Sequence, residues 1–276
     1  MKHHPIEPAI TAARIKPLLA TDIVGRKIYA FSQIASTNDY ARRLAKNGED
    51  EGAVIITDSQ TRGRGRYHRR WFSPPGKGLW LSVLLRPTTH WDGIGLMSLL
   101  AGLAVSEAID KETGMTTQLK WPNDVLHNNR KVSGILIESE TQNAHLVVGI
   151  GINVNQTASD FPESLRHRAT SLLLETGIVN SRMRLLVGVL NELEHNYKRF
   201  LTGDHEWLRC KWLARCAHKD MDVTVTCGEM TIEGVFQTID TNGAMILRSS
   251  PGEVHRIRSG ELSHLGVTTL QSEHFS

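Results

Sequence analysis

Residues 60–71 hold five arginines and two glycines, a density of charge that a protein core does not contain. They read Gln-Thr-Arg-Gly-Arg-Gly-Arg-Tyr-His-Arg-Arg-Trp. Arginine offers planar, permanently charged donors to phosphate and carboxylate, and alternating glycines let backbone N–H groups approach an anion. Because five guanidinium groups are not buried together without partners, we expect a flexible loop that binds an anion and becomes ordered around it.

A solvated basic loop and an RNA-binding Arg-Gly segment are the alternatives for residues 60–71. Arg-Gly segments that bind RNA are usually repetitive and terminal, whereas this is a single cluster between two apolar runs. The whole chain carries a formal charge of only +3, which is weak support for a nucleic-acid partner. These observations favour a small anionic ligand and leave both alternatives open.

Two further polar stretches, 120–124 (KWPND) and 130–138 (RKVSGILIE), flank a predicted hairpin. Pro122 forces an irregular bend after two strand residues and so exposes the polar side chains around it at the end of the strand. Lys131 begins the next strand, close to the end of the first. We therefore expect Lys120, Asp124 and Lys131 to converge near one edge of a sheet, with a hairpin of solvated charges as the alternative.

Residues 149–155 (GIGINVN) are the fourth stretch whose residues could bind a ligand. Their alternating glycines would let a planar ligand pack closely on a strand. Asn153 offers both a donor and an acceptor, so it can recognise the edge of a base or a ribose. By itself, a strand with spaced glycines is weak evidence for a ligand site.

The elements that must position these stretches follow from hydrophobic periodicity. Ser36 followed by Asp39 predicts the start of a helix that ends at Asn47-Gly48. Apolar runs and alternation predict strands, and apolar residues at helical spacing predict helices. The strands are 53–57, 79–85, 118–121, 125–127, 132–138 and 145–150, and the further helices are 94–112, 185–197 and 204–216.

The pattern of apolar and turn residues changes near residue 221. Beyond it, short alternating apolar runs are separated by turn residues, among them Asn242-Gly243 and Pro251-Gly252. Several short strands in about 50 residues predict a small antiparallel barrel. We therefore expect a break between two units at 218–221.

Composition bounds the class of protein. The hydrophobic fraction is 40% and the charged fraction 22%, as in ordinary globular proteins. The cysteines Cys210, Cys216 and Cys227 cannot all pair and match no metal-ligand spacing, so we expect free thiols in a reducing compartment. No apolar stretch reaches the roughly 20 residues of a spanning helix, and the N-terminus lacks the apolar segment of a signal peptide. We expect a cytoplasmic protein.

Taken together and in this order, the stretches resemble the biotin protein ligases. The resemblance rests on Ser36-Thr37-Asn38 opening a helix, Gln60 with Gly-Arg-Gly-Arg at 63–66, Trp-Phe-Ser-Pro at 71–74, and the three stretches at 120–124, 130–138 and 149–155. It covers roughly residues 28–265, including Ser259-Gly260-Glu261. The combination is highly specific, although no single piece of it is.

The resemblance implies an α+β fold, a mixed β-sheet flanked by helices, with a small C-terminal SH3-like β-barrel. The domains would be a short N-terminal extension at 1–26, a biotin/lipoate ligase-like catalytic domain at 27–218 and the barrel at 219–276. About 26 residues are too few for the helix-turn-helix domain of bifunctional members, so we expect no DNA binding. The sequence leaves both a monomer and a homodimer open.

The implied reaction has two steps. Biotin and ATP, with Mg²⁺, would form biotinyl-5′-adenylate and pyrophosphate, and the ε-amine of a lysine on a biotin carboxyl carrier protein would then displace AMP. The carrier would belong to acetyl-CoA carboxylase or a similar biotin-dependent enzyme. A lipoyl or octanoyl ligase of the same fold and a non-catalytic nucleic-acid-binding protein are the alternatives.

The resemblance also assigns residues. Lys131, Arg66 and Asp124 would be catalytic, with Asp124 orienting or deprotonating the incoming amine unless it only pairs with a neighbouring lysine. No protein side chain is expected as a fixed metal ligand. The expected biotin-binding residues are Ser36, Thr37, Asn38, Gln60, Gly63, Arg64, Gly65, Arg66, Lys131 and Gly134. The expected ATP- and adenylate-binding residues are Arg64, Arg66, Lys120, Asn123, Lys131 and Asn153.

One position departs from the family pattern. The loop usually carries a second glycine two residues after the Gly-Arg-Gly-Arg run, and this chain has His68 there, after Tyr67. A bulkier residue would reduce the flexibility of the loop. We therefore expect altered closing kinetics with the same anion contacts.

Overall fold

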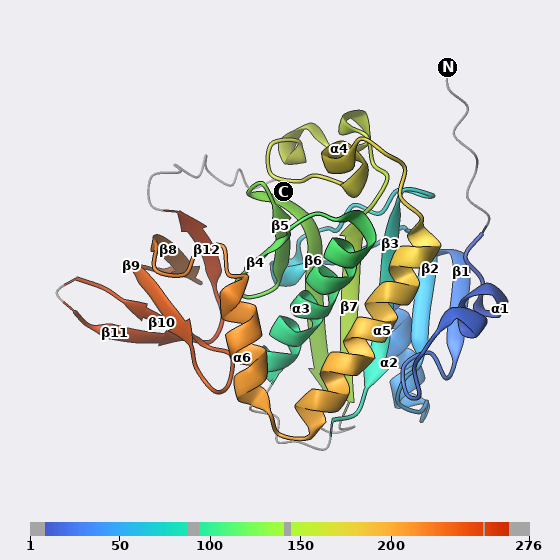
Figure 1. Ribbon diagram of the computed structural model, residues 1–276, viewed down its shortest axis with the longest axis horizontal. Helices are drawn as coiled ribbons and strands as arrows, with labels where there is room; N and C mark the ends of the chain where they lie inside the picture. Colours follow the sequence, from blue (N-terminus) through green and yellow to red (C-terminus); the bar gives the residue numbers. More distant parts are fainter. Residues whose placement is uncertain (1–8, 88–93, 141–144, 251, 265–276) are drawn as a thin grey trace.

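The computed structural model describes residues 9–87, 94–140, 145–250 and 252–264. Seven strands form one sheet in the order β1-β2-β3-β7-β6-β5-β4 (Figure 1). Strands β1 and β2 are parallel and the other neighbours are antiparallel, which confirms the predicted mixed sheet. The strands are β1 Ile28–Ile34, β2 Val54–Gln60, β3 Gly78–Leu85, β4 Gln118–Lys120, β5 Asp124–His127, β6 Arg130–Glu140 and β7 His145–Asn153.

Helices cover both faces of this sheet, as expected for an α+β fold. Helix α2 (Thr37–Lys46) packs on β2, β3 and β7, whereas α3 (Ile94–Thr113) and α5 (Arg182–Leu201) lie side by side on the opposite face (Figure 1). Strand β2 contributes to two cores, because Val54 and Ile56 join the α3–α5 side while Ile55 joins the α2 side. This explains its apolar run: a strand buried on both faces cannot alternate polar and apolar residues.

The predicted hairpin at Asn128-Asn129 is confirmed. Both residues adopt left-handed φ angles of 48° and 59°, and they join β5 to β6. Asparagine tolerates this conformation better than most residues, which suits it to a tight hairpin turn. The hairpin pairs Leu126 with Lys131, while β4 pairs Lys120 with Asp124. The two chemistry-bearing stretches therefore meet at one edge of the sheet.

The second sheet contains five strands in the order β11-β10-β9-β8-β12. They are β8 Asp222–Cys227, β9 Met230–Ile239, β10 Met245–Arg248, β11 Val254–Ile257 and β12 Glu261–His264. Within the described part of the chain, β12 pairs with β8 alone and β11 with β10 alone. The expected closed barrel is therefore not confirmed, because closure requires β11 and β12 to share backbone hydrogen bonds, and the sheet described is open.

The remaining elements are short. Helix α6 (His205–Ala214) lies between the two sheets in sequence, and α4 (Leu172–Thr176) was not expected. The expected N-terminal extension at 1–26 contains the short helix α1 (Ala12–Ile15), and residues 1–8 lie outside the described ranges. The 3₁₀ segments are η1 Lys16–Leu18, η2 Arg66–His68, η5 Ala158–Asp160 and η6 Glu163–Leu165. The domain boundary predicted at 218–219 stays a prediction.

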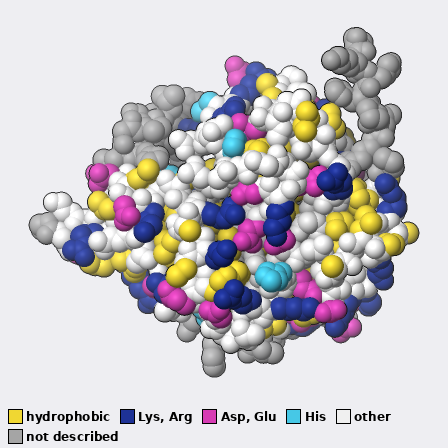
Figure 2. All heavy atoms as spheres, in the orientation of Figure 1, with side chains coloured by type: hydrophobic (Ala, Val, Ile, Leu, Met, Phe, Trp, Pro, Cys, Tyr) yellow, Lys and Arg dark blue, Asp and Glu magenta, His cyan; other side chains and the backbone are white. Residues whose placement is uncertain are grey.

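The surface and the cysteines agree with the expectations from composition. Figure 2 shows basic and acidic side chains interspersed over the visible face, without a broad field of one sign. The three cysteines are free, and burial raises the pKa of the Cys216 thiol to about 11, so this thiol stays protonated and unreactive. Within the described ranges, no helix is long and apolar enough to cross a membrane.

Candidate active site

The N-terminus of α2 fixes the first group of expected site residues. Ser36 is the N-cap, and its hydroxyl accepts a hydrogen bond from the Asp39 N–H at 3.4 Å, as the sequence predicts. The Thr37 N–H donates to Gln60 Oε1 at 2.9 Å, and Gln60 Nε2 donates to Ser73 Oγ at 3.0 Å. Gln60 is thereby held between the helix and the end of the arginine-rich loop.

Asn38 is buried behind this group, and both ends of its amide are engaged. The Ser82 hydroxyl lies 2.6 Å from Asn38 Oδ1, and Asn38 Nδ2 donates to Glu138 Oε2 at 2.8 Å. Gly149 of β7 lies directly against this amide, since a Cβ atom there would come within 2.1 Å of Asn38 Oδ1. The missing side chain at position 149 therefore makes room for Asn38 on the sheet.

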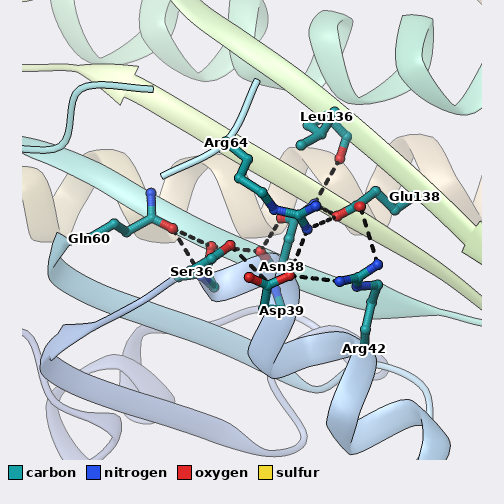
Figure 3. Close-up of polar contacts among 10 residues, drawn as sticks. Ser36, Asn38, Asp39, Arg42, Gln60, Arg64, Leu136 and Glu138 are labelled. Carbon is teal, nitrogen blue, oxygen red and sulfur yellow. Dashed lines mark hydrogen bonds and ion pairs between the residues drawn. The ribbon is translucent and has the colours of Figure 1, made fainter. Parts of the chain in front are cut away.

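Four charged side chains lie between Asn38 and the arginine-rich loop, and Figure 3 shows their contacts. They are Asp39, Arg42, Arg64 and Glu138. Arg64 Nη2 lies 2.8 Å from Asp39 Oδ1 and 2.7 Å from Glu138 Oε2. Arg42 Nη2 lies 2.7 Å from the same Asp39 oxygen. Arg64, an expected phosphate contact, thus has its charge offset by two carboxylates. Its part in anion binding stays a prediction.

The arginine-rich loop has a defined conformation. The Trp71 N–H donates to the Gly63 carbonyl at 2.9 Å and the Gly65 N–H to the Arg69 carbonyl at 2.7 Å, so the loop is a small hairpin. Gly63 is required by close approach, because a Cβ atom there would lie 2.5 Å from the Trp71 carbonyl. The end of the hairpin turns through Tyr67 and His68, whose φ angles are 54° and 59°. His68 thus adopts a backbone conformation that favours glycine, the residue usual in the family at this position.

The indole of Trp71 packs on Gly151, one of the two spaced glycines of β7, and on Gly134 of the neighbouring strand β6. A Cβ atom at Gly151 would lie 2.5 Å from the indole, and one at Gly134 would lie 2.9 Å from it. Trp71 also meets Trp80 edge to face, with ring centroids 6.3 Å apart. The expected planar ligand on this strand stays a prediction, and Trp71 is a residue of the site that the motif alone did not single out.

Lys131, Asp124 and Lys120 converge as predicted. Lys131 Nζ lies 2.6 Å from Asp124 Oδ1 and 5.2 Å from the centroid of the Trp71 ring. Burial is the main factor that lowers the pKa of Lys120; Asp124 opposes the shift and Lys131 adds to it. Two lysines therefore share one carboxylate, which leaves a net positive charge beside Trp71. Such a cluster is suited to an anionic ligand that supplies the missing negative charge.

Asn123, the residue before Asp124, joins this cluster to Arg66 of the loop. Asn123 Nδ2 donates to the Ile135 carbonyl at 2.8 Å, and Arg66 Nη1 donates to Asn123 Oδ1 at 3.3 Å. Both line a cavity of about 360 Å³ between the two sheets, together with Ser98, Asn242 and Arg258. The loop, the 120–124 turn and the C-terminal unit therefore meet around one cavity.

Asn153 is buried, and its amide serves the backbone. Its Nδ2 donates to the Thr170 carbonyl at 3.0 Å, and its Oδ1 accepts from Gln156 Nε2 at 3.2 Å. The segment bearing Thr170 also brackets Lys131, because the Lys131 N–H donates to the Arg168 carbonyl and the Thr170 N–H donates to the Lys131 carbonyl. Asn153 thus fixes the surroundings of Lys131, and its predicted contact with adenine stays a prediction.

Several residues of the site were missed by sequence reasoning. Ser82 lies in an apolar run where a serine carries no signal. Ser73 belongs to the Trp-Phe-Ser-Pro motif but was given no role, and Asp39 was noted only as part of a helix start. Glu138 ends one of the motifs but was given no role. Among the described residues, no group of three or more His, Cys, Asp or Glu side chains could hold a metal ion.

The sequence that carries this site is similar to those of known proteins. The family model described as "Biotin/lipoate A/B protein ligase family" matches residues 30–155. The bifunctional ligase/repressor BirA of Bacillus subtilis is 32% identical over 256 residues, which are 92% of this chain and 78% of that protein. The chain belongs to the biotin protein ligase family.

Other members of the biotin protein ligase family agree in sequence and in fold. The biotin–[acetyl-CoA-carboxylase] ligase of Mycobacterium tuberculosis is 32% identical over 249 residues, with 87% of this chain and 90% of that protein covered. The biotin protein ligase of Aquifex aeolicus, solved in complex with biotin and ATP, superposes with a TM-score of 0.77 at 34% identity and covers 86% of this chain and 98% of its own. The resemblance on which the sequence analysis rests is confirmed.

Proposed function

We propose that this chain is an ATP-dependent, AMP-forming biotin protein ligase. It activates biotin to biotinyl-5′-adenylate and transfers the biotinyl group to a lysine of a biotin carboxyl carrier protein. The observation that carries the proposal is a site with two chemically different ends. One is an amide and hydroxyl cluster around the buried Asn38 and the half-buried Gln60, and the other is a cationic cluster at Lys120 and Lys131. Family membership supports the same conclusion.

The polar end suits the ureido head of biotin. A ureido group has one carbonyl acceptor and two N–H donors, and the buried groups around it can exchange their present partners for these. The dithiolane ring of a lipoyl substrate offers no such pairing and would leave the amides of Asn38 and Gln60 unsatisfied. A site built to hydrogen-bond a substrate rejects an analogue that lacks the matching groups. This argument favours biotin over lipoate or octanoate.

The cationic end suits adenylate formation. The biotin carboxylate must approach the α-phosphorus of ATP although both carry negative charge. Lys131 and Arg66 would stabilise the charge that moves onto the leaving pyrophosphate, with Lys120 and Asn123 beside them. The ion pair with Asp124 holds the Lys131 ammonium in place until the anions arrive. Mg²⁺, which we expect with the triphosphate, would supply further charge neutralisation.

The second step requires an acceptor lysine and a protected intermediate. The mixed anhydride is reactive, so the arginine-rich loop would exclude water from it until the carrier docks. We propose the carrier domain of acetyl-CoA carboxylase or a similar biotin-dependent enzyme as the acceptor, and the cytoplasm as the compartment. Asp124 lies close enough to the cationic cluster to accept a proton from the amine once Lys131 has turned to the phosphate.

The test is biotin-dependent exchange of labelled pyrophosphate into ATP, followed by transfer to a purified carrier domain. We expect exchange with biotin and none with lipoate, and labelling of the carrier but not of a variant whose acceptor lysine is arginine. Lipoate-dependent exchange would favour the lipoyl alternative. Failure of both exchange and transfer would refute the proposal, and salt-sensitive RNA binding would then favour the nucleic-acid alternative.

A further inference from the structure

The tip of the arginine-rich loop contacts the C-terminal sheet. Arg66 Nη2 lies 3.1 Å from Ser259 Oγ, and Arg66 Nη1 donates to the Gly260 carbonyl at 3.2 Å. The Tyr67 hydroxyl lies 2.9 Å from Arg66 Nη2 and 3.1 Å from Ser259 Oγ. Arg69 forms an ion pair with Glu261 in the same segment. A loop near residue 66 and a turn nearly 200 residues later in the chain thus share one set of contacts.

The charge of Arg66 remains unneutralised by these contacts. Its hydrogen-bond partners in the structure are uncharged oxygens, on Asn123, Tyr67, Ser259 and Gly260. Arg64, two residues earlier, lies between two carboxylates instead. Among the described residues, the guanidinium of Arg66 is therefore oriented without an acidic partner, and its charge is available to an anion in the neighbouring cavity.

The turn that receives Arg66 is packed firmly on its own sheet. Cys227 Sγ lies 3.1 Å from the Ser259 carbonyl oxygen. A Cβ atom at Gly260 would come within 2.8 Å of Val225 and 2.9 Å of Cys227 Sγ, so the backbone of the turn lies directly against β8. A turn without room to shift is a fixed anchor, whereas a mobile turn would move with the loop.

The tip of the loop that meets this anchor is a tight turn, which the Arg69 N–H closes by donating to the Arg66 carbonyl at 3.2 Å. Tyr67 and His68 are consecutive non-glycine residues with positive φ. Left-handed residues of this kind persist when surrounding contacts hold them in place. Two consecutive positive φ angles are the geometry of a two-residue hairpin turn. Tyr67 is 49% exposed, so its ring is held from outside, by the hydroxyl contact with Ser259 and the stacking of Arg66 on the ring.

We propose that Tyr67 and Ser259 are positioning residues that hold Arg66 at the site and thereby keep the loop closed over the acyl-adenylate. The C-terminal sheet then acts in retention of the intermediate as well as in the architecture of the protein. The inference rests on the proposed function for its chemistry. The clamp itself is a property of the free protein, so it can be tested without any ligand.

The first experiment uses no substrate. The loop contains five arginines, so trypsin cleaves it whenever it opens. We expect Tyr67→Phe and Ser259→Ala each to speed cleavage within residues 62–70 about fivefold, the usual effect of one lost hydrogen bond. Ser259→Thr keeps the hydroxyl and should restore slow cleavage. Ser263→Ala, on the same sheet and away from the loop, is the matched control.

The second experiment measures the intermediate. Enzyme loaded with biotin and ATP is separated from free nucleotide, and decay of bound biotinyl-adenylate is compared with the rate of pyrophosphate exchange. We expect the half-life of the intermediate to fall about fivefold in Tyr67→Phe and in Ser259→Ala, with a smaller change in exchange. The double variant should decay faster than either single one but by less than the product of the two effects, because both substitutions remove the Tyr67–Ser259 hydrogen bond and each also removes its own contact with Arg66.

The outcomes separate the inference from the proposed function. Unchanged cleavage in both single variants, or effects on decay that multiply in the double variant, would overturn the clamp. If the variants open the loop as expected while the wild-type protein forms no adenylate, the clamp stands and the proposed function fails. A general loss of stability is recognised because it would accelerate cleavage outside residues 62–70 as well.

Discussion

Arg64 and Glu138 form an ion pair of 2.7 Å across 74 positions of sequence, and the same Glu138 oxygen accepts the amide of Asn38 at 2.8 Å. One carboxylate thus joins the arginine-rich loop to the buried polar end of the site. Because both donors depend on it, Glu138 couples the closure of the loop to the orientation of Asn38. The position of Glu138 at the end of a motif concealed this role.

Glu138→Gln should raise the biotin KM about tenfold in the exchange assay, with a smaller effect on kcat, because a hydrogen bond to a charged group contributes about 1.5–3 kcal/mol. The substitution keeps an oxygen acceptor but removes the charge that holds Arg64. Glu192→Gln is the matched control, since Glu192 pairs with the exposed Lys111 at 2.6 Å. A biotin KM within twofold of wild type would show that Glu138 has no such role.

Gly149→Ala should impair biotin binding more than ATP binding. The new Cβ atom would lie 2.1 Å from Asn38 Oδ1, so the amide must move or the sheet must distort. We expect the biotin KM to rise tenfold or more, on the order of the 1–3 kcal/mol that overpacking costs. The control is Gly188→Ala within α5, where the nearest atom is 3.7 Å away and the melting temperature should rise. Equal KM values in the two variants would contradict the placement of Asn38 in the biotin site.

Lys131→Ala should depress biotin-dependent exchange by about 10² or more, the cost of removing one donor that stabilises developing charge. The assay is initial-rate exchange at saturating biotin and ATP. The exposed Lys111 provides the control substitution Lys111→Ala, which should leave exchange unchanged. Activity within about threefold of wild type would mean that the role given to Lys131 is wrong.

Lys120→Met should stabilise the protein at neutral pH while raising the KM for ATP. Burial lowers the pKa of Lys120 from 10.5, so the folded chain holds this proton less tightly than the unfolded chain does. Between the lowered pKa and 10.5 the unfolded state binds more protons, and the free energy of unfolding therefore increases as the pH rises through this window.

The Lys120→Met variant should lack the contribution of Lys120 to this increase in the free energy of unfolding, because the methionine side chain has no proton to release. Urea unfolding of wild type and variant between pH 7 and pH 11 gives the difference, in which the titration of groups that do not interact with Lys120 cancels. Lys211→Met, at an exposed position, is the control. A variant that is less stable than wild type at pH 7 would show that the buried ammonium is not a cost to the fold.

The sequence by itself determined which chemistry the chain carries and most of the elements that support it. The apolar runs of β2 and β3, the capped start of α2 at Ser36 and the asparagine turn at 128–129 are local signals, and each led to the right element. The convergence of Lys120, Asp124 and Lys131 was also predictable, because a hairpin joins residues that are near in sequence. Local spacing was sufficient in these cases.

Tertiary structure alone decided the partners that come from distant strands and from the other unit. Ser82 reaches Asn38 across 44 positions, Glu138 reaches Arg64 across 74 and Ser259 reaches Arg66 across 193, and no periodicity encodes such pairs. Tertiary structure also decided that the C-terminal sheet is open. Short alternating runs predict its strands, but they do not predict whether β12 pairs with β11. Side-chain identity sets what a residue can bind, whereas the packing of sheet, helix and loop sets what it meets.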